Sequence, residues 1–294
     1  MSNDPTAPKP SFSPESAGQQ GRSHRFTLER VYPALLFAPL FYLVVRYAPP
    51  IAFFALIVVV AGLALWEFTK MTEHSSPSLS SLLISFTSLV LILTLLQWTT
   101  HDGLTGFFTL LLIGLLIFLM FAPGRLRQMI SHPLGMLFGV FYIGLCLGHL
   151  LLIRKLESGD LLIFFVILVT WAADTAGYYV GASIGTRAIA PRLSPKKTIE
   201  GFMAGMIFSM LMAVLCHFWF LPSLSIVHCL VLGILLSCVG LLGDLAESAF
   251  KRSAGIKDSG SLIPGHGGFL DRIDSLLLTA PTFYYYMLTF GPLA

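Results

Sequence analysis

The chain has 294 residues, of which 55% are hydrophobic and only 11% are charged. Soluble domains carry about 25% charged residues, so this composition excludes an ordinary soluble domain and predicts a polytopic membrane protein. The formal net charge is only +3, and nothing in the sequence predicts a nucleic-acid partner. The four cysteines lie in apolar runs without CxxC spacing, and we interpret them as buried small hydrophobic residues.

The predicted architecture is an all-α transmembrane helix bundle that follows a polar tail. Residues 1–30 are rich in Pro, Ser, Gly and Gln, which predicts a disordered cytoplasmic tail. Apolar runs of about 20 residues can cross a bilayer as helices. They form an N-terminal group within 31–155 and a C-terminal region, 156–294, with polar loops; strand alternation is absent. We predict nine spans, at 32–46, 50–68, 79–98, 104–122, 133–153, 161–181, 202–221, 225–247 and 273–290.

Lysine and arginine are distributed unevenly between the two sides of the predicted bundle. Of the 18 Lys and Arg residues, only Arg46, Arg154 and Lys155 fall on the side opposite the N-terminal tail. Because cytoplasmic loops carry an excess of these residues, we predict a cytoplasmic N-terminus. The loop after the sixth span and the polar stretch between the eighth and ninth spans then also face the cytoplasm.

The most polar stretch lies between the last two spans and reads SAFKRSAGIKDSGSLIPGHGGFLDRID, from Ser248 to Asp274. Lys and Arg recognise phosphate, glycines let backbone N–H groups approach a ligand, and paired Asp residues hold Mg²⁺ together with phosphate oxygens. These residue types predict phosphoryl or nucleotidyl transfer at a membrane surface. The stretch contains the cations Lys251, Arg252, Lys257 and Arg272, the carboxylates Asp258, Asp271 and Asp274, and His266.

Further carboxylates lie in the predicted spans, near the same side of the membrane. Asp174 lies inside the sixth span, and Asp244 and Glu247 lie near the end of the eighth. Charges at such depth are costly and usually face a cavity or a partner, so we predict a shared polar cavity open to the cytoplasm. Asp271 and Asp274 are three residues apart at a helix start, and we expect them to share a face.

Each of these patterns has a structural alternative. Asp244, Asp271 and Asp274 can hold one or two divalent cations, or they can complement a helix dipole and form salt bridges. Asp244, Glu247, Ser248 and Lys251 are spaced as one stripe of a helix that continues beyond the membrane. That stripe either faces a ligand or is a solvated helix end with a Glu247–Lys251 pair.

Two loops supply further candidates for phosphate binding. In SPKKTIEG (194–201), Lys196 and Lys197 suit a phosphate or a lipid head group, or they set topology and attract anionic lipid. PGHGG (264–268) predicts a tight turn whose amides could cradle phosphate. His266 in this turn is either a donor, acid or base, or a structural residue.

The stretch from Ser248 to Asp274 resembles the signature of the phosphatidate cytidylyltransferases, also called CDP-diacylglycerol synthases. That pattern runs Ser-x-apolar-Lys-Arg, four residues, Lys-Asp, then Pro/Gly-x-His-Gly-Gly-apolar-x-Asp-Arg-apolar-Asp. SPKKTIEG, DTAGYYVG and GDLAES also look like elements of that family, and the resemblance covers about residues 160–290. The matching positions are Ser248, Lys251, Arg252, Lys257, Asp258, Pro264, His266, Gly267, Gly268, Asp271, Arg272 and Asp274.

The resemblance implies an enzyme that converts CTP and phosphatidate to CDP-diacylglycerol and pyrophosphate for phospholipid biosynthesis, with Mg²⁺. It also implies direct attack of the lipid phosphate on the CTP α-phosphorus, a monovalent cation such as K⁺ beside the metal, and a homodimer. The compact chain fits the cytoplasmic membrane of a bacterium, and an organelle membrane stays open as an alternative. Residues 156–294 become the catalytic region. The resemblance makes Asp244, Asp271 and Asp274 metal ligands and, with Lys251 and Arg252, the catalytic residues; the substrate-binding residues are Ser194, Lys196, Lys197, Ser248, Lys257, Asp258, His266, Gly267, Gly268 and Arg272.

Two classes of alternative remain open at the level of sequence. A CDP-alcohol phosphatidyltransferase needs the motif Asp-x-x-Asp-Gly-x-x-Ala-Arg, which this chain lacks. An enzyme that uses an isoprenoid lipid phosphate, or a CTP-dependent polyprenol kinase, is harder to exclude, because apolar spans carry no readable code for the lipid tail. A secondary transporter with an ion site at Asp174 would show repeated halves, and none is visible.

Overall fold

The computed structural model describes residues 32–72, 79–98, 102–121, 132–191, 193–256, 259–260 and 268–291, and every structural statement below concerns these ranges. The chain divides into two units, Met1–Pro39 and Leu40–Ala294, and the account below is of the second unit. The predicted tail, 1–30, lies outside the described residues. The further division of the chain at residue 155 stays a prediction.

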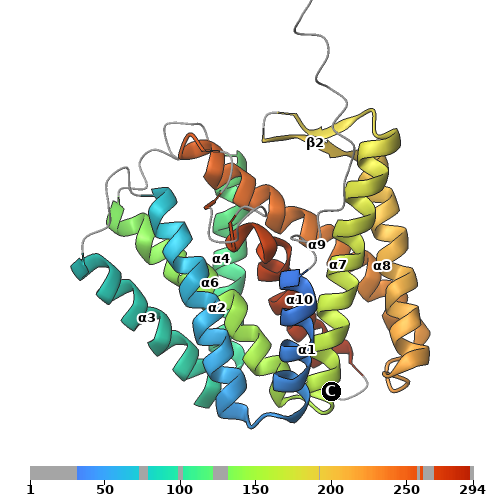
Figure 1. The fold of residues 1–294 in the computed structure, drawn as a ribbon, viewed down its shortest axis with the longest axis horizontal. Helices are drawn as coiled ribbons and strands as arrows, with labels where there is room; N and C mark the ends of the chain where they lie inside the picture. Colours follow the sequence, from blue (N-terminus) through green and yellow to red (C-terminus); the bar gives the residue numbers. More distant parts are fainter. Residues whose placement is uncertain are drawn as a thin grey trace, which may run out of the picture. The chain divides into compact units, whose positions relative to one another are not determined.

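Long apolar helices make up most of the described chain (Figure 1). They are α1 (Tyr32–Tyr47), α2 (Pro50–Thr72), α3 (Leu79–Trp98), α4 (Asp102–Phe121), α6 (His132–Lys155), α7 (Gly159–Ile184), α8 (Ile199–Trp219), α9 (Ile226–Ser253) and α10 (Asp274–Phe290), with a 3-10 helix, η3, at Leu270–Arg272. Five of them, α2, α6, α7, α8 and α9, are long and apolar enough to cross a membrane. This confirms the predicted all-α membrane bundle. The number of spans and the orientation of the N-terminus stay predictions.

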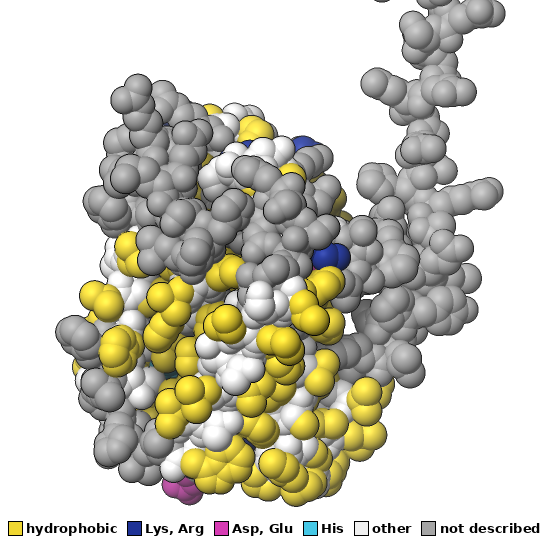
Figure 2. Space-filling model, turned by 90° about the vertical axis from the view of Figure 1, so that its left-hand side faces the viewer, with side chains coloured by type: hydrophobic (Ala, Val, Ile, Leu, Met, Phe, Trp, Pro, Cys, Tyr) yellow, Lys and Arg dark blue, Asp and Glu magenta, His cyan; other side chains and the backbone are white. Residues whose placement is uncertain are grey.

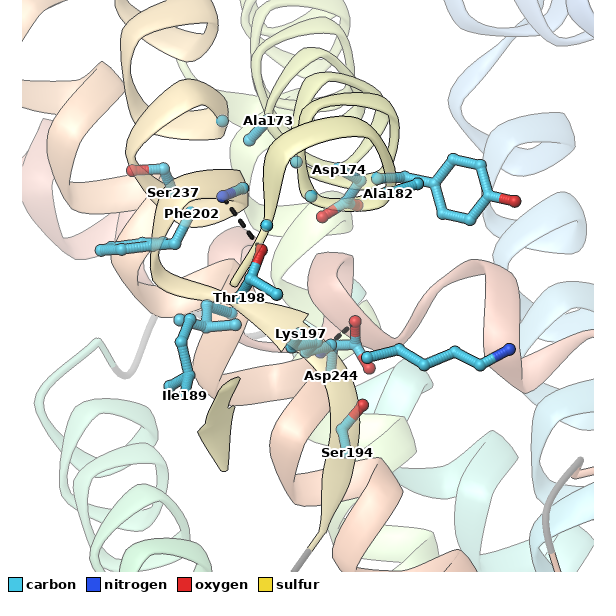
Figure 3. A pocket seen from close by; sticks show the side chains of 18 of the residues that line it. Ala173, Asp174, Ala182, Ile189, Ser194, Lys197, Thr198, Phe202, Ser237 and Asp244 are labelled. Atoms are coloured by element: carbon cyan, nitrogen blue, oxygen red, sulfur yellow. Dashed lines mark hydrogen bonds and ion pairs between the residues drawn. The ribbon is translucent and has the colours of Figure 1, made fainter. Parts of the chain in front are cut away.

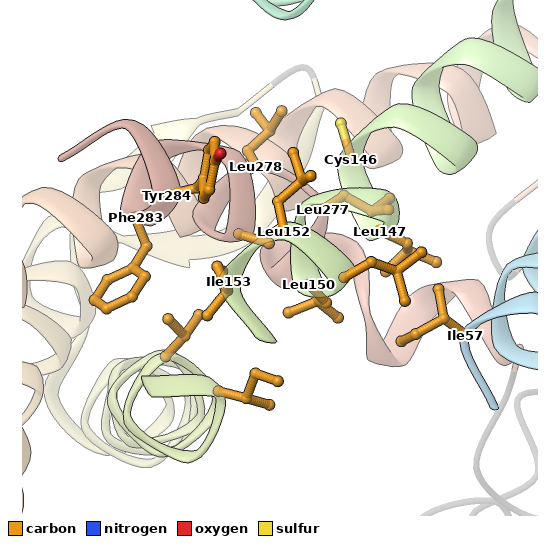
Figure 4. Close-up of a cluster of buried hydrophobic side chains, with 14 of the residues drawn as sticks. Ile57, Cys146, Leu147, Leu150, Leu152, Ile153, Leu277, Leu278, Phe283 and Tyr284 are labelled. Carbon is orange, nitrogen blue, oxygen red and sulfur yellow. The ribbon is translucent and has the colours of Figure 1, made fainter. Parts of the chain in front are cut away.

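The helix α6 lies at the centre of the packing. In α6, 89% of the apolar window is buried inside the protein, against 28% in α8. Figure 4 shows Leu147, Leu150 and Ile153 of α6 in one cluster with Leu277 and Leu278 of α10. The outer helices instead expose large hydrophobic side chains, and Figure 2 shows such side chains across the described part of one face. Lipid tails can cover this surface, as a membrane protein requires.

A small antiparallel sheet interrupts the helical pattern between α7 and α8. Strand β1 (Ala188–Ala190) pairs with β2 (Ser194–Thr198), with Ala188 opposite Thr198. The sequence predicted no strands, because runs of three and five residues are too short to show an alternating pattern. In Figure 1 the hairpin lies at one end of the paired helices α7 and α8. Thr198 also caps α8, since its hydroxyl accepts the N–H of Gly201 at 3.2 Å.

The three cations that were predicted to lie opposite the others are gathered at turns between helices. Arg46 forms an ion pair with Asp160. Arg154, next to Lys155 at the end of α6, donates to the backbone oxygen of Ala48 at 3.3 Å. These contacts join the α1–α2 turn to the α6–α7 turn.

Helices α7 and α8 approach each other through glycines. A Cβ on Gly205 of α8 would lie 2.7 Å from the backbone oxygen of Ala173 in α7, and one on Gly201 would lie 2.6 Å from that of Gly177. Both distances are shorter than real Cβ contacts. Small residues that let backbones approach are a common basis of helix association in membranes.

We therefore expect Gly205→Ala to lower the thermal midpoint of the detergent-solubilised protein. Overpacking of a tight contact costs about 1–3 kcal/mol, and the neighbour here is backbone, which cannot rotate away. The matched control is Gly114→Ala in α4, where an added Cβ meets nothing within 4 Å. An equal midpoint for the two variants would contradict this account of the α7–α8 contact.

Candidate active site

Three carboxylates from two helices meet near the hairpin. Asp244 and Glu247 lie three residues apart on α9 and share a face, as their spacing predicted. Asp274 is the first residue of α10, which packs beside α9. One oxygen atom from each of these three residues lies within 4.8 Å of the others. Glu247 and Asp274 are buried, whereas Asp244 is partly exposed.

Asp271, the third member of the predicted metal triad, is not a member of this group. A shared helix face was expected for Asp271 and Asp274. However, Asp271 belongs to η3, and α10 begins only at Asp274. Between them Ile273 has φ −121° and ψ 3°, which interrupts the helix. The role of Asp271 as a metal ligand therefore stays a prediction, and Glu247 occupies the third position of the cluster.

Asp271 instead binds a lysine and two backbone groups. Its Oδ1 accepts the Nζ of Lys251 at 2.6 Å, and its Oδ2 accepts the N–H groups of Ser259 at 3.2 Å and Gly268 at 3.0 Å. Burial by itself would raise the pKa of Asp271, but the hydrogen bond and charge of Lys251 and the N–H of Gly268 outweigh it and lower the pKa to about 2. Asp271 is thus ionised at neutral pH.

Lys251 connects Asp271 to the carboxylate cluster. Its Nζ also lies 3.0 Å from Oε2 of Glu247, so the predicted Glu247–Lys251 pair is present. The side chains are only 1% and 12% exposed, so this pair is buried and is no solvated helix end. The other oxygen of Glu247, Oε1, is buried without a hydrogen-bond partner among the described residues.

A cavity of 590 Å³ opens beside Asp244, within the usual size range of small-molecule sites. Residues from α7, β2, α8 and α9 line it (Figure 3). Ser194, Lys196 and Lys197 of the hairpin are among them, and Lys197 forms an ion pair with Asp244. The structure thus brings the SPKKT strand and the end of α9 together at one hollow.

Asp174 lies on the same cavity, as its position in the sixth predicted span suggested. It lines the wall formed by α7, and its Oδ1 accepts the hydroxyl of Ser275 at 3.2 Å. Ser275 in turn donates its backbone N–H to Asp274 at 2.7 Å. This chain of hydrogen bonds links the cavity wall to the carboxylate cluster.

The other predicted site residues are placed as follows. Arg252 is exposed and donates to the backbone oxygens of Leu193 at 3.3 Å and Ile256 at 3.1 Å. Ser248 is buried on α9, and Arg272 is exposed in η3. Gly268 is buried, and a Cβ there would lie 1.8 Å from Ser259 Oγ and 2.8 Å from Glu67 Oε2. Lys257, Asp258, His266 and Gly267 lie outside the described residues.

Two carboxylates were missing from the predicted metal and substrate sites. Glu247 was assigned to the helical stripe and the shared cavity but not to the metal site, although its spacing from Asp244 already placed both on one face. Glu67 in α2 was overlooked, yet it is 1% exposed and accepts hydrogen bonds from the polar stretch. Its signal in the sequence is a lone acidic residue in an apolar helix, PIAFFALIVVVAGLALWEFTKMT.

The cluster has the donors that a divalent cation needs. Carboxylate oxygens are the ligands that hard cations prefer. Three carboxylates this close repel one another unless a positive charge lies between them, and Oε1 of Glu247 is a buried oxygen still free to ligate within the described part of the site. Asp244, Glu247 and Asp274 are therefore the residues that fit such an ion.

Comparison with known proteins identifies the family of the chain. The model of the "Cytidylyltransferase family" matches residues 28–290. The chain therefore belongs to the cytidylyltransferase family and is a nucleotidyltransferase, which confirms the resemblance seen in the sequence.

Individual relatives carry a more specific name. The chain is 32% identical to a phosphatidate cytidylyltransferase of Bacillus subtilis over 269 residues, which is 90% of this chain and 97% of the relative. It is 42% identical to one of Haemophilus influenzae over 44% of this chain and 46% of the relative. It is 45% identical to one of Synechocystis over 47% of each chain.

Proposed function

We propose that the chain transfers the cytidylyl group of CTP to phosphatidate. An oxygen of the lipid phosphate attacks the α-phosphorus of CTP, the bond from that phosphorus to the β-phosphate oxygen breaks, and pyrophosphate leaves with the electron pair. The products are CDP-diacylglycerol and pyrophosphate. Both reactants supply their own reacting atoms, so no covalent intermediate with the protein is needed.

One observation carries the proposal: Asp244, a member of the three-carboxylate cluster, also lines a cavity between membrane helices that is lined by Lys196 and Lys197. The match to the Bacillus phosphatidate cytidylyltransferase over nearly the full length of both chains supports the choice of substrates. A soluble, highly anionic nucleotide and a membrane-bound phospholipid need a site that is polar, cationic in part and reachable from both phases.

We assign different roles to the residues at the cavity and in the carboxylate cluster. Lys196 and Lys197 at the cavity neutralise phosphate charge on the bound reactants. Asp244, Glu247 and Asp274 would hold a divalent cation, which we propose to be Mg²⁺. When bound, this ion would supply charge stabilisation to the phosphate oxygens. Catalysis then depends on alignment of the two reactants and on preorganised charge.

The location of the cavity suits a lipid acceptor. Its walls come from α7, α8 and α9, three helices long enough to cross the membrane, so the acyl chains can stay in the bilayer while the head group enters. We place the protein in the cytoplasmic membrane of a bacterium, with the cavity facing the cytoplasm where CTP is present. The excess of Lys and Arg on the predicted cytoplasmic side supports this orientation.

The test is incorporation of radiolabelled CTP into lipid by the purified protein, with phosphatidate and polyprenyl phosphate compared as acceptors. We expect labelled CDP-diacylglycerol and an equal amount of pyrophosphate with phosphatidate. Labelling of the polyprenyl phosphate alone would overturn the choice of lipid. Absence of pyrophosphate with either acceptor would overturn nucleotidyl transfer.

We expect Lys197→Met to raise KM for one of the anionic substrates by about tenfold. Removal of this cation leaves Asp244 facing the incoming phosphates without its partner, and a charge-assisted hydrogen bond contributes about 1.5–3 kcal/mol. Lys70→Met is the matched control, because Lys70 is exposed and lies over the ring of Trp66. Unchanged KM values for both substrates in Lys197→Met would show that Lys197 does not contribute to substrate binding.

A further inference from the structure

Glu67 is a buried carboxylate in the half of the chain that carries no recognisable motif. It lies near the end of α2, and only 1% of its surface is exposed. Its neighbour Phe68 packs against Phe250 of α9 with 5.7 Å between ring centroids and against Phe138 of α6 at 6.3 Å. The backbone around Glu67 is therefore held by packing against the same helix that carries Asp244 and Glu247.

The carboxylate of Glu67 joins two points that are eleven residues apart in the polar stretch. Its Oε2 accepts the hydroxyl of Ser259 at 3.1 Å and the backbone N–H of Leu270 at 2.8 Å. These two residues flank the segment 261–267, which lies outside the described residues. One side chain from α2 thus joins two described parts of the polar stretch, 259–260 and 268–274.

Glycines in the polar stretch leave the space that Glu67 occupies. A Cβ on Gly260 would lie 2.5 Å from Glu67 Oε1, 2.9 Å from Cδ and 3.2 Å from Cγ, so the three nearest atoms all belong to Glu67. A Cβ on Gly268 would lie 1.8 Å from the hydroxyl oxygen of Ser259, which donates to Glu67, and 2.8 Å from Glu67 Oε2. Among the described glycines only Gly255 has a positive φ, so Gly260 is needed for room rather than for its backbone conformation.

Ser259 binds both carboxylates, since its hydroxyl donates to Glu67 and its backbone N–H donates to Asp271. The N–H of Ser259 and the N–H of Gly268 both donate to Oδ2 of Asp271. Asp271 orients Lys251, whose Nζ also reaches Glu247 of the carboxylate cluster. A continuous path of hydrogen bonds therefore runs from α2 through the polar stretch to the proposed metal site.

We propose that Glu67 is a positioning residue for cytidylyl transfer, which sets the polar stretch so that Asp271 and Lys251 are correctly placed beside the carboxylate cluster. The N-terminal helices are then part of the catalytic apparatus and not only a membrane anchor. This inference rests on the proposed function for its kinetic readout. Its structural readout, the order of the polar stretch, is independent of substrate.

The first test compares Glu67→Ala with Glu67→Gln in the full-length protein. We expect Glu67→Ala to lower kcat by about 10²-fold, the scale of a 1 Å misplacement, with a smaller change in KM for CTP. Glu67→Gln keeps one oxygen that can accept from Ser259 and Leu270, so we expect it to restore most of the lost kcat. The control is Glu157→Gln, an exposed carboxylate in the α6–α7 turn.

Hydrogen exchange of the peptide that spans residues 254–276 accompanies the kinetics. We expect faster exchange there in Glu67→Ala and wild-type exchange in α7 and α8. Wild-type kcat in Glu67→Ala, or unchanged exchange in this peptide, would overturn the inference. Absence of CDP-diacylglycerol from the wild type would instead overturn the proposed function, and the exchange result would still test the role of Glu67.

A double-variant cycle separates positioning from general damage. Gly260→Ala should lower kcat while Glu67 is present, because the new Cβ collides with its carboxylate. In the Glu67→Ala background the same change should cost little, because the colliding atoms are gone. Gly114→Ala is the matched control, with open space around its added Cβ. Independent, additive effects of Gly260→Ala and Glu67→Ala would overturn the proposed contact.

Discussion

Replacement of Asp274 by Asn is expected to lower turnover by at least about 100-fold, the scale seen when groups around a bound metal are lost, while the protein still inserts and folds. Asp274 is 8% exposed and contributes one oxygen to the cluster with Asp244 and Glu247. Asn is the same size, and its oxygen can still accept the N–H of Ser275, so the start of α10 is kept. The negative charge needed to hold a cation is lost.

The measurement is the rate of CDP-diacylglycerol formation as a function of Mg²⁺ concentration. Asp160→Asn is the matched control, because it makes the same change in a carboxylate whose partner, Arg46, is an exposed residue in the last turn of α1. An exposed ion pair contributes only about 0–1 kcal/mol. Wild-type turnover of Asp274→Asn at saturating Mg²⁺ would exclude Asp274 as a metal ligand.

The second large effect is expected for Lys251→Met, which should lower both stability and turnover. Lys251 is the cation shared by Glu247 and Asp271, and its side chain is 12% exposed. Removal of one partner of a buried ion pair costs about 3–5 kcal/mol, because a charge is left buried and unpaired. Met keeps the length of the side chain, so the loss will come from charge and not from a cavity.

The stability loss is measured as a fall in the thermal midpoint in detergent. In the double variant Lys251→Met/Glu247→Gln the unpaired buried charge of Glu247 is removed, and part of the midpoint should return although turnover should not. The control is Lys70→Met, which removes an exposed lysine in the last turn of α2. A wild-type midpoint for Lys251→Met would show that the two carboxylates do not depend on it.

Much of the fold was predictable because membrane helices follow a simple physical rule. A run of apolar residues long enough to cross the bilayer must form a helix, since no water can satisfy its backbone groups. The ranges predicted for spans 50–68 and 161–181 lie within α2 and α7. The strands at 188–190 and 194–198 were not predictable in this way, because a short hairpin depends on contacts with neighbouring helices.

The carboxylate cluster shows where spacing along the sequence succeeds and where it fails. Asp244 and Glu247 share a face because α9 is one continuous helix through both positions. The same argument failed for Asp271 and Asp274, because η3 ends and α10 begins between them. Because α10 begins at Asp274 and not at Asp271, the side chain of Asp271 binds Lys251 and does not join the carboxylate cluster. Helix boundaries are uncertain by one or two residues.

Glu67 could not be assigned a role from the sequence, because its partners lie about 200 residues further along the chain. Its contact with Leu270 joins positions whose sequence separation is 203. Only the packing of α2 against α6 and η3 brings them together. An acidic residue in an apolar run marks such a position as unusual, but the fold is needed to show what it holds.

The glycines in the cavity wall limit how the cavity could be changed to bind a larger head group. Gly177, Gly181, Gly201 and Gly205 line it where α7 and α8 meet, so backbone atoms already form that surface. Glycine has no side chain to shorten, so no substitution at these positions can enlarge the cavity, and any substitution adds atoms. A variant that accepts a bulkier head group would therefore have to arise at lining residues with larger side chains, such as Phe202 of α8 or Leu241 of α9, or by separating the two helices.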